Sequence, residues 1–307
     1  MTKRRRGRCA TTEERIRFGI VGGFGPFDPE ALVADAVHAE SAGFDLFSLP
    51  DHLHSSQPTL EPWTALAFVA AATERLTVLT NVLGLPYRPP AVTAKMAETL
   101  DRLSGGRLVL GLGVGGYDPE FAAFGLAERT PGQKVAALDE AIRIIRGLWE
   151  EPTFTLDGEH FQVRQAQIEP KPGHHIPIWT GAYGPRALRV TAALADGWIP
   201  SIGRLGLEDA IELRAAVVSG LEEAGRSPET FTFATNLVVS FEGAAQRGIA
   251  QGWQQLTGDS ETIADRLAEI ARAGFTVLNV ALPGRVAAEQ FASDVIPAVR
   301  ARVPRAG

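Results

Sequence analysis

Short apolar runs alternate with segments of helical spacing along most of the chain. The first run, 17–21, ends in Gly22 and Gly23, and Asp28 with Pro29 then predicts a helix start before apolar residues spaced by three and four. The same order recurs, and a predicted helix follows every run. The predicted strands are 17–21, 44–49, 76–82, 108–110, 176–180, 197–199, 231–241 and 276–282.

Eight strand–helix pairs over about 290 residues predict an α/β fold of the TIM (β/α)8 barrel type. A doubly wound parallel sheet of similar length is the alternative. The strand count favours the barrel, and so do the glycines or polar residues just past several strand ends. In a barrel these ends converge on one face, where the active site lies.

Two segments fall outside this alternation. The stretch 152–172 predicts a hairpin with a two-residue turn at Asp157 and Gly158, inserted between the fourth and fifth strands. Residues 1–15 are predicted to be a disordered basic tail, and 16–307 a single barrel domain.

The stretch 107–121, RLVLGLGVGGYDPEF, places four glycines at the end of an apolar run. Its spacing matches G-x-G-x-x-G, but a dinucleotide-binding unit needs a helix at the third glycine. Pro119 disfavours helix at Asp118, and the next strong helix signal is Thr130 with Pro131. We therefore interpret the glycines as a strand end lining a planar or phosphate-bearing ligand, with a purely structural glycine-rich loop as the alternative.

Composition narrows the class of protein. The 307 residues carry a net charge of −6, which argues against nucleic acid as the main partner. The basic run at Lys3 to Arg6 has no apolar segment behind it, so neither a secretory signal nor a membrane span is predicted. Cys9 is the single cysteine, which rules out an intramolecular disulfide and suits a cytoplasmic protein.

Polar residues at the predicted strand ends are the candidates for chemistry. Asp51 and His52 follow the second strand, and a histidine there is a candidate acid or base. Loop capping is the alternative for this pair. His52 and His54 also form an H-x-H pair, but later strand ends offer too few ligands for a metal-dependent hydrolase. No metal site is therefore predicted.

Two further segments belong to the same predicted face. The backbone N–H groups where the helix after the fifth strand starts, near Gly184, are suited to a phosphate, and Arg186 adds a positive charge. An ordinary loop with a first-turn proline is the alternative there. Trp253, after the seventh strand, is a candidate substrate-pocket residue, with a packed loop tryptophan as the alternative.

Four motifs in this order resemble the bacterial luciferase-like monooxygenase superfamily. They are AESAGFDLFSLPDHL (39–53), LTVLTNVL (76–83), AETLDRLSGGRLVLGLGVGGYDPEFAAFG (97–125) and PIWTGAYGPRALRVTAALADGWIP (177–200). The resemblance implies a TIM barrel that binds FMN or the deazaflavin coenzyme F420 at its C-terminal face. The PDH and LSGGR segments look most like the F420-dependent branch.

The resemblance also implies residue roles. Asp51 and His52 would lie by the deazaflavin ring, and a non-proline cis peptide at Asn81-Val82 would support it. The phosphate region of the cofactor would be held by Val114, Gly115, Gly181, Ala182, Tyr183, Gly184, Pro185 and Arg186. One departure concerns the sugar-phosphate dehydrogenases of the superfamily, whose catalytic Glu is replaced here by Gly116, with Glu120 the nearest carboxylate downstream. Glucose-6-phosphate oxidation is therefore not expected.

The resemblance and these residues together imply an F420-dependent oxidoreductase that transfers hydride to or from a small organic substrate, with His52 as the proton donor or the stabiliser of developing charge. An FMN-dependent monooxygenase supplied by a separate flavin reductase is one alternative, and a non-catalytic flavin-binding protein is another. A homo-oligomer, specifically a homodimer, is also expected.

Overall fold

A computed structural model gives the structure of the protein and describes residues 16–22, 28–55, 58–243 and 254–303. The predicted basic tail and the predicted pocket residue Trp253 lie outside these ranges. None of the helices within them is long and apolar enough to cross a membrane.

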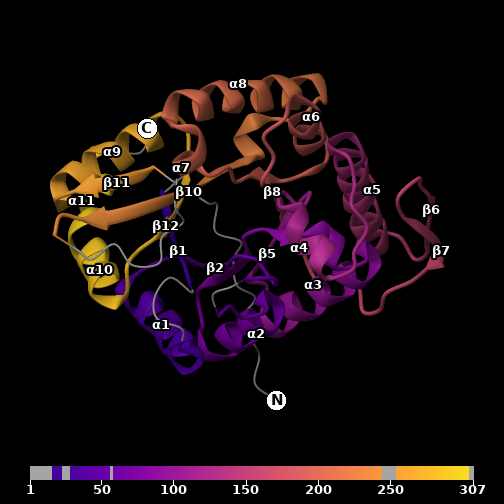
Figure 1. Ribbon diagram of the computed structural model, residues 1–307, viewed down its shortest axis with the longest axis horizontal. Coiled ribbons are helices and arrows are strands. Elements are labelled where there is room, and N and C mark those ends of the chain that lie inside the picture. Colours follow the sequence, from indigo (N-terminus) through magenta and orange to yellow (C-terminus); the bar gives the residue numbers. More distant parts are fainter. Residues whose placement is uncertain (1–15, 23–27, 56–57, 244–253, 304–307) are drawn as a thin grey trace, which may run out of the picture.

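Eight parallel strands close into a barrel, as the alternation predicts (Figure 1). The ring is continuous because β1 pairs with both β2 and β12, and β10 pairs with β9. The helices pack around its outside. The barrel strands are β1 (Arg17–Val21), β2 (Leu46–Leu49), β3 (Thr77–Thr80), β5 (Leu108–Gly113), β8 (Ile178–Thr180), β9 (Gly197–Trp198), β10 (Thr232–Phe241) and β12 (Val277–Ala281).

The surrounding helices begin where the sequence signals predict. Asp28 and Asp259 cap their helices through side-chain oxygens, and Thr130 forms a capping box with Gln133. The last predicted helix, 286–302, is divided by a π-helical turn at Phe291–Val295. The helices are α1 (Pro29–Ala42), α2 (Pro62–Ala72), α3 (Pro90–Ser104), α5 (Pro131–Glu150), α6 (Pro185–Leu194), α8 (Leu207–Glu223), α9 (Ser260–Arg272), α10 (Arg285–Gln290) and α11 (Ile296–Arg302).

Several short elements were not predicted. The most important is α4 (Asp118–Ala123), which the expectation of no helix at Asp118 missed. Pro119 lies in its first turn, where a missing N–H costs nothing because that group has no partner inside the helix. The others are β4 (Leu83–Gly84), a 3-10 turn at Leu85–Tyr87, α7 (Ile202–Leu205), a 3-10 turn at Pro228–Thr230 and β11 (Gln255–Gly258).

The hairpin insertion is confirmed, but its predicted two-residue turn is wrong. Strands β6 (Phe154–Asp157) and β7 (Gln162–Ala166) pair with Asp157 opposite Gln162, which leaves the loop 158–161 between them. The carboxylate of Glu140 on α5 accepts the N–H groups of Glu159, His160 and Phe161. The N–H of Gly158 also donates to the carbonyl of Phe161 at 3.1 Å, so the turn combines one internal hydrogen bond with three from Glu140. The hairpin lies outside α5, away from the barrel (Figure 1).

Side chains inside the barrel form layers because strand residues alternate between the lumen and the helices. The lowest layer is apolar and consists of Leu46, Leu79, Val109, Trp179, Ile199, Ala234 and Val277. Two residues further along the strands lie a hydroxyl, three amides and two glycines, namely Ser48, Asn81, Asn236, Asn279, Gly111 and Gly181. Val21, Val238 and Ala281 form an apolar cluster nearer the strand ends.

Glycines in β5 leave room for the side chain of Val82, which packs toward the lumen. A Cβ atom on Gly113 would lie 2.6 Å from Cγ2 of Val82, and one on Gly181 would lie 3.2 Å from it. A Cβ atom on Gly111 would lie 1.9 Å from the backbone oxygen of Thr80. These glycines therefore serve the packing of the protein itself, which favours the structural alternative for this part of the stretch. At Gly116, by contrast, a Cβ atom would meet nothing within 4 Å.

This packing leads to a stability prediction. Gly111→Ala should lower the free energy of unfolding by about 3 kcal/mol, the upper part of the range for overpacked interiors, because backbone has to move. Gly116→Ala is the matched control and should change it by less than about 0.5 kcal/mol. Urea unfolding followed by circular dichroism measures both. Equal midpoints for the two variants would contradict the described packing.

Candidate functional site

The C-terminal ends of the parallel strands share one face of the barrel, as predicted. His52 follows β2, Asn81 follows β3, Gly115 follows β5 and Gly181 follows β8. The structure therefore brings together four of the segments that the sequence marks as candidates. We call this face the mouth.

Asp51 has a different position from the one expected for a ligand-binding residue. Its side chain has 0% exposure, and its Oδ2 accepts the N–H of Gly84 at 2.9 Å and Nη1 of Arg88 at 2.7 Å. Its Oδ1 accepts Nη2 of Arg88 at 3.1 Å. The carboxylate is fully enclosed and anchors the loop that carries His52. The predicted place of Asp51 beside a cofactor stays a prediction.

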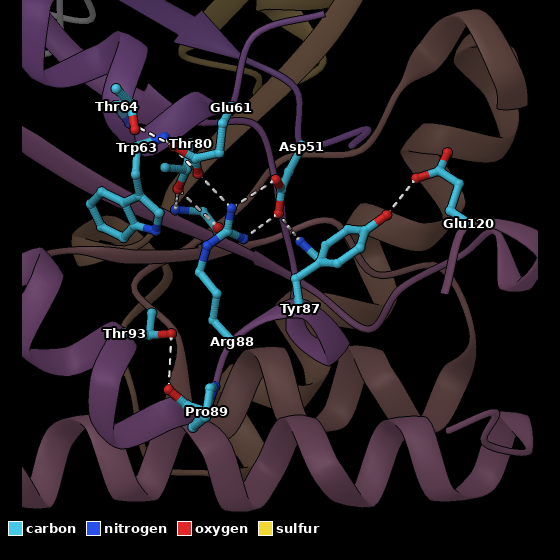
Figure 2. Close-up of polar contacts among 12 residues, drawn as sticks. Asp51, Glu61, Trp63, Thr64, Thr80, Tyr87, Arg88, Pro89, Thr93 and Glu120 are labelled. Carbon is cyan, nitrogen blue, oxygen red and sulfur yellow. Dashed lines mark hydrogen bonds and ion pairs between the residues drawn. The ribbon is translucent and has the colours of Figure 1, made fainter. Parts of the chain in front are cut away.

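Arg88 links Asp51 to a second carboxylate, that of Glu61 (Figure 2). Burial alone would lower the pKa of the Arg88 guanidinium, but the hydrogen bonds and charges of Asp51 and Glu61 outweigh it and raise this pKa. Glu61 also caps α2 by accepting the N–H groups of Trp63 and Thr64. The loop after β2, the turn after β4 and the start of α2 are thus tied together by one buried guanidinium.

His52 lies at the mouth with 63% of its side chain exposed. Its Nδ1 is 2.7 Å from Oε1 of Glu120, whose side chain is only 7% exposed. The other carboxylate oxygen of Glu120 accepts the hydroxyl of Tyr87 at 2.9 Å (Figure 2). Burial, the hydrogen bond to Glu120 and the negative charges of Glu120 and Asp51 raise the pKa of Tyr87. Tyr87 is therefore a protonated donor throughout the physiological range.

Sequence reasoning noted Glu120 as a nearby carboxylate but missed this contact. The missed signal is the first-turn proline Pro119, which starts α4 and turns the following residues toward the barrel. The ring of Phe121 is buried and lies 4.8 Å from that of Tyr87. A Cβ atom on Gly115, which has φ +81°, would lie 2.8 Å from the Phe121 ring. Gly115 therefore lets Phe121 dock, and this docking sets the position of Glu120.

The peptide bond between Asn81 and Val82 is cis, as the resemblance implies. The side-chain amides of Asn81 and Asn236 exchange two hydrogen bonds, of 2.8 and 3.1 Å. Asn236 also accepts Nδ2 of Asn279 at 2.7 Å, and Asn279 donates to Ser48 at 2.9 Å. This chain of hydrogen bonds supports the end of β3 from beneath.

The segment 181–186 supplies an uncapped helix start. Gly184 precedes α6 without any capping side chain, so its first N–H groups have no side-chain acceptor. Ala182 and Tyr183 have internal partners, because the Ala182 carbonyl accepts Nε1 of Trp198 and the Tyr183 hydroxyl accepts the N–H of Ser201. Pro185 occupies the first turn, and Val114, at the end of β5, is half-buried.

Arg186 is exposed and lies in a groove between α5 and α6. A Cβ atom on Gly132, in the first turn of α5, would lie 3.3 Å from its Nη1. Asp139, Glu140 and Arg189 line the same groove. Arg204 on α7 is a cation that sequence reasoning missed, and its guanidinium carbon lies 6.0 Å from the centre of the Tyr183 ring. In the described part of the chain, no three His, Cys, Asp or Glu side chains gather as a metal site.

Comparison with known proteins places this geometry in a family. The family model described as luciferase-like monooxygenase matches residues 7–253. The chain belongs to the luciferase-like monooxygenase family. Among its relatives, the F420-dependent glucose-6-phosphate dehydrogenase of Nakamurella multipartita is 34% identical over 245 residues, which cover 78% of this chain and 71% of that protein. The enzyme of the same name from Intrasporangium calvum is 28% identical and covers 89% and 96% of the two chains.

Solved structures of the luciferase-like fold superpose on nearly the whole chain. An F420-dependent secondary alcohol dehydrogenase in complex with an F420-acetone adduct has a TM-score of 0.83 at 18% identity, over 93% of this chain and 99% of that chain. The coenzyme F420-dependent tetrahydromethanopterin reductase of Methanopyrus kandleri has a TM-score of 0.79 at 20% identity, over 93% and 100%. These likenesses confirm the barrel fold of this family member.

The buried charge network beneath the mouth generates a second prediction. Arg88→Met should lower the free energy of unfolding by about 3–5 kcal/mol, because it leaves the enclosed Asp51 carboxylate without its cation. Arg143→Met removes the cation of an exposed pair with Asp139 on α5 and should cost about 0.5 kcal/mol or less. Urea unfolding of both variants gives the comparison. A small effect of Arg88→Met would show that Asp51 does not depend on it.

Proposed function

We propose that the protein is an F420-dependent oxidoreductase that transfers a hydride between the deazaflavin and a small organic substrate. The observation that carries this proposal is the 34% identity to an F420-dependent dehydrogenase over 78% of the chain. Other relatives at 31–34% identity carry the same name. These relatives support F420 as the cofactor.

The mouth has features that fit such a cofactor. Cβ atoms on Gly116 and Gly184 would meet nothing within 4 Å, so backbone is open to a ligand at two of the strand ends. The first N–H groups of α6 and the guanidinium of Arg186 would hold the phosphate region. The cis peptide at Asn81-Val82 would support the ring, with His52 beside it, and the backbone of Val114 and Gly115 would lie by the phosphate region.

F420 supplies the acceptance or donation of a hydride when it is bound. The protein has to orient the substrate and move the accompanying proton. Oxidation of a carbinol releases its hydroxyl proton, and reduction of a polarised double bond requires one. The Nε2 atom of His52 is the group we assign to this proton, because it belongs to an exposed imidazole at the mouth.

The substrate of the named relatives is not carried over. At the position where the resemblance implies the catalytic Glu of the sugar-phosphate dehydrogenases, this chain has the side-chain-free Gly116. We therefore propose a substrate with a carbinol or an activated C=C, C=O or C=N bond rather than glucose 6-phosphate. A homodimer remains a proposal, which exposed apolar side chains on α2 and α3, such as Phe68 and Leu103, support. A cytoplasmic location also remains a proposal, which the single cysteine supports.

The alternative is an FMN-dependent monooxygenase that receives reduced flavin from a separate reductase. The description of the family model favours it, since that description names monooxygenases. The two cofactors share their phosphate region and differ in the ring system. Binding of the oxidised cofactors therefore discriminates between the two functions before any substrate is known.

Titration of the purified protein with each cofactor tests the proposed function. F420 should bind with at least tenfold higher affinity than FMN, measured by quenching of cofactor fluorescence and by calorimetry. Reduced F420 should then be reoxidised by a member of a panel of activated alkenes, ketones and imines. Tight binding of FMN with none of F420 would overturn the proposal in favour of the alternative.

The helix start at α6 generates a separate prediction. Arg186→Ala should weaken F420 binding by about 1–3 kcal/mol, the range for hydrogen bonds to charged groups. Arg189→Ala removes another exposed cation from the same helix and groove and should leave the affinity unchanged. Equal affinities for both variants would remove Arg186 from the phosphate site.

A further inference from the structure

Glu120 has an unusual position for a carboxylate on a short surface helix. Only 7% of its side chain is exposed, and each of its two oxygens has one partner: His52 on Oε1 and Tyr87 on Oε2. Among the described residues, no lysine or arginine forms an ion pair with it. Burial of a carboxylate is costly unless its oxygens are hydrogen-bonded, so the contacts with His52 and Tyr87 account for its stability here.

The partner of Glu120 is the residue that we place in the chemistry. The carboxylate contacts Nδ1 of His52 at 2.7 Å, and the imidazole is otherwise exposed at the mouth. An ionised carboxylate only accepts hydrogen bonds, so this contact requires a proton on Nδ1. In the neutral ring Nε2 then carries a lone pair and is ready to take a proton.

We propose that Glu120 is a positioning residue that holds His52 in the Nδ1–H tautomer with Nε2 directed to the substrate, and that Tyr87 orients the Glu120 carboxylate. This proposal rests on the proposed function, because it gives His52 its role in hydride transfer. The carboxylate acts through the imidazole and not on the substrate. Its role therefore differs from that of the catalytic Glu in the sugar-phosphate dehydrogenases, whose position is occupied by Gly116 in this chain.

The negative charge of Glu120 would stabilise the His52 imidazolium that forms during the reaction. When a carbinol is oxidised, its C–H bond yields the hydride and its O–H proton passes to Nε2 of His52. The imidazolium that forms is then stabilised by the negative charge of Glu120. The other charged groups close to this pair are Asp51, which Arg88 neutralises, and Tyr87, whose raised pKa keeps it a donor.

The variant that isolates this role is Glu120→Gln, because it preserves the shape of the side chain. The Tyr87 hydroxyl still requires an acceptor at the Oε2 position, so the amide oxygen takes that position and the amide NH2 group faces Nδ1. His52 then has to accept at Nδ1 and carry its proton on Nε2, which removes the base from the mouth. Asp118→Asn is the matched control, because Asp118 lies on the same helix and pairs with Lys134 instead.

Nitrogen-15 NMR of the histidine side chains measures the tautomer without any cofactor. His52, assigned by its loss in His52→Ala, should be the Nδ1–H tautomer in the native protein and in Asp118→Asn, and the Nε2–H tautomer in Glu120→Gln. An Nε2–H tautomer in the native protein would overturn the proposal. This readout is independent of F420. It therefore distinguishes failure of the proposed function from failure of the proposed role of Glu120 toward His52.

Kinetics in the direction of carbinol oxidation, with oxidised F420 and the carbinol that corresponds to a ketone found in the cofactor screen, test the consequence. Glu120→Gln should lower kcat by roughly 10²–10⁴-fold, as should His52→Ala, with KM and F420 affinity changed less than threefold. The double variant should be no slower than His52→Ala, because Glu120 acts through His52. Losses that multiply in the double variant, or a Glu120→Gln rate equal to that of Asp118→Asn, would overturn the role.

Discussion

The lumen of a closed barrel has to be filled with side chains. In the second layer of this barrel, part of the space is filled by Val82, a residue that follows β3. β5 and β8 contribute glycines there, and the side chain of Val82 occupies the space that their missing side chains leave. With Val82 inside, Leu83 and Gly84 pair with β5, and the N–H of Gly84 is available to Asp51. Phe121 then docks over Gly84 and Gly115. The positions of both His52 and Glu120 depend on this packing.

The regular part of the fold could be predicted because it follows from local patterns. Apolar runs, proline at helix starts and capping side chains located the barrel strands and long helices to within a few residues, and β1 and α2 to the residue. The four-residue turn of the hairpin was not predictable, because three of its hydrogen bonds come from Glu140 on another element. The π turn in the last helix has no local signal that the pattern reveals.

The candidate site was predicted at the level of segments and less well at the level of side chains. Strand ends converge in any barrel, so His52, Asn81 and the start of α6 were placed correctly by topology alone. The burial of Asp51 depends on Arg88, which lies on a different loop. The contact of Glu120 with His52 joins residues 68 positions apart, through a helix that the sequence pattern did not reveal. Such tertiary partners are what a single sequence conceals.

The chain of amides beneath the mouth has a consequence for how the protein is made. Asn81, Asn236 and Asn279 come from early, late and very late parts of the chain, and β1 completes the ring only by pairing with β12. During synthesis the first half of the chain therefore carries polar lumen side chains, such as that of Asn81, whose hydrogen-bond partners come from the second half. The ring and the amide chain are complete only with β12, which follows most of the outer helices in the sequence. Truncation near the carboxyl end would therefore remove the site even though most of its residues lie in the first half of the chain.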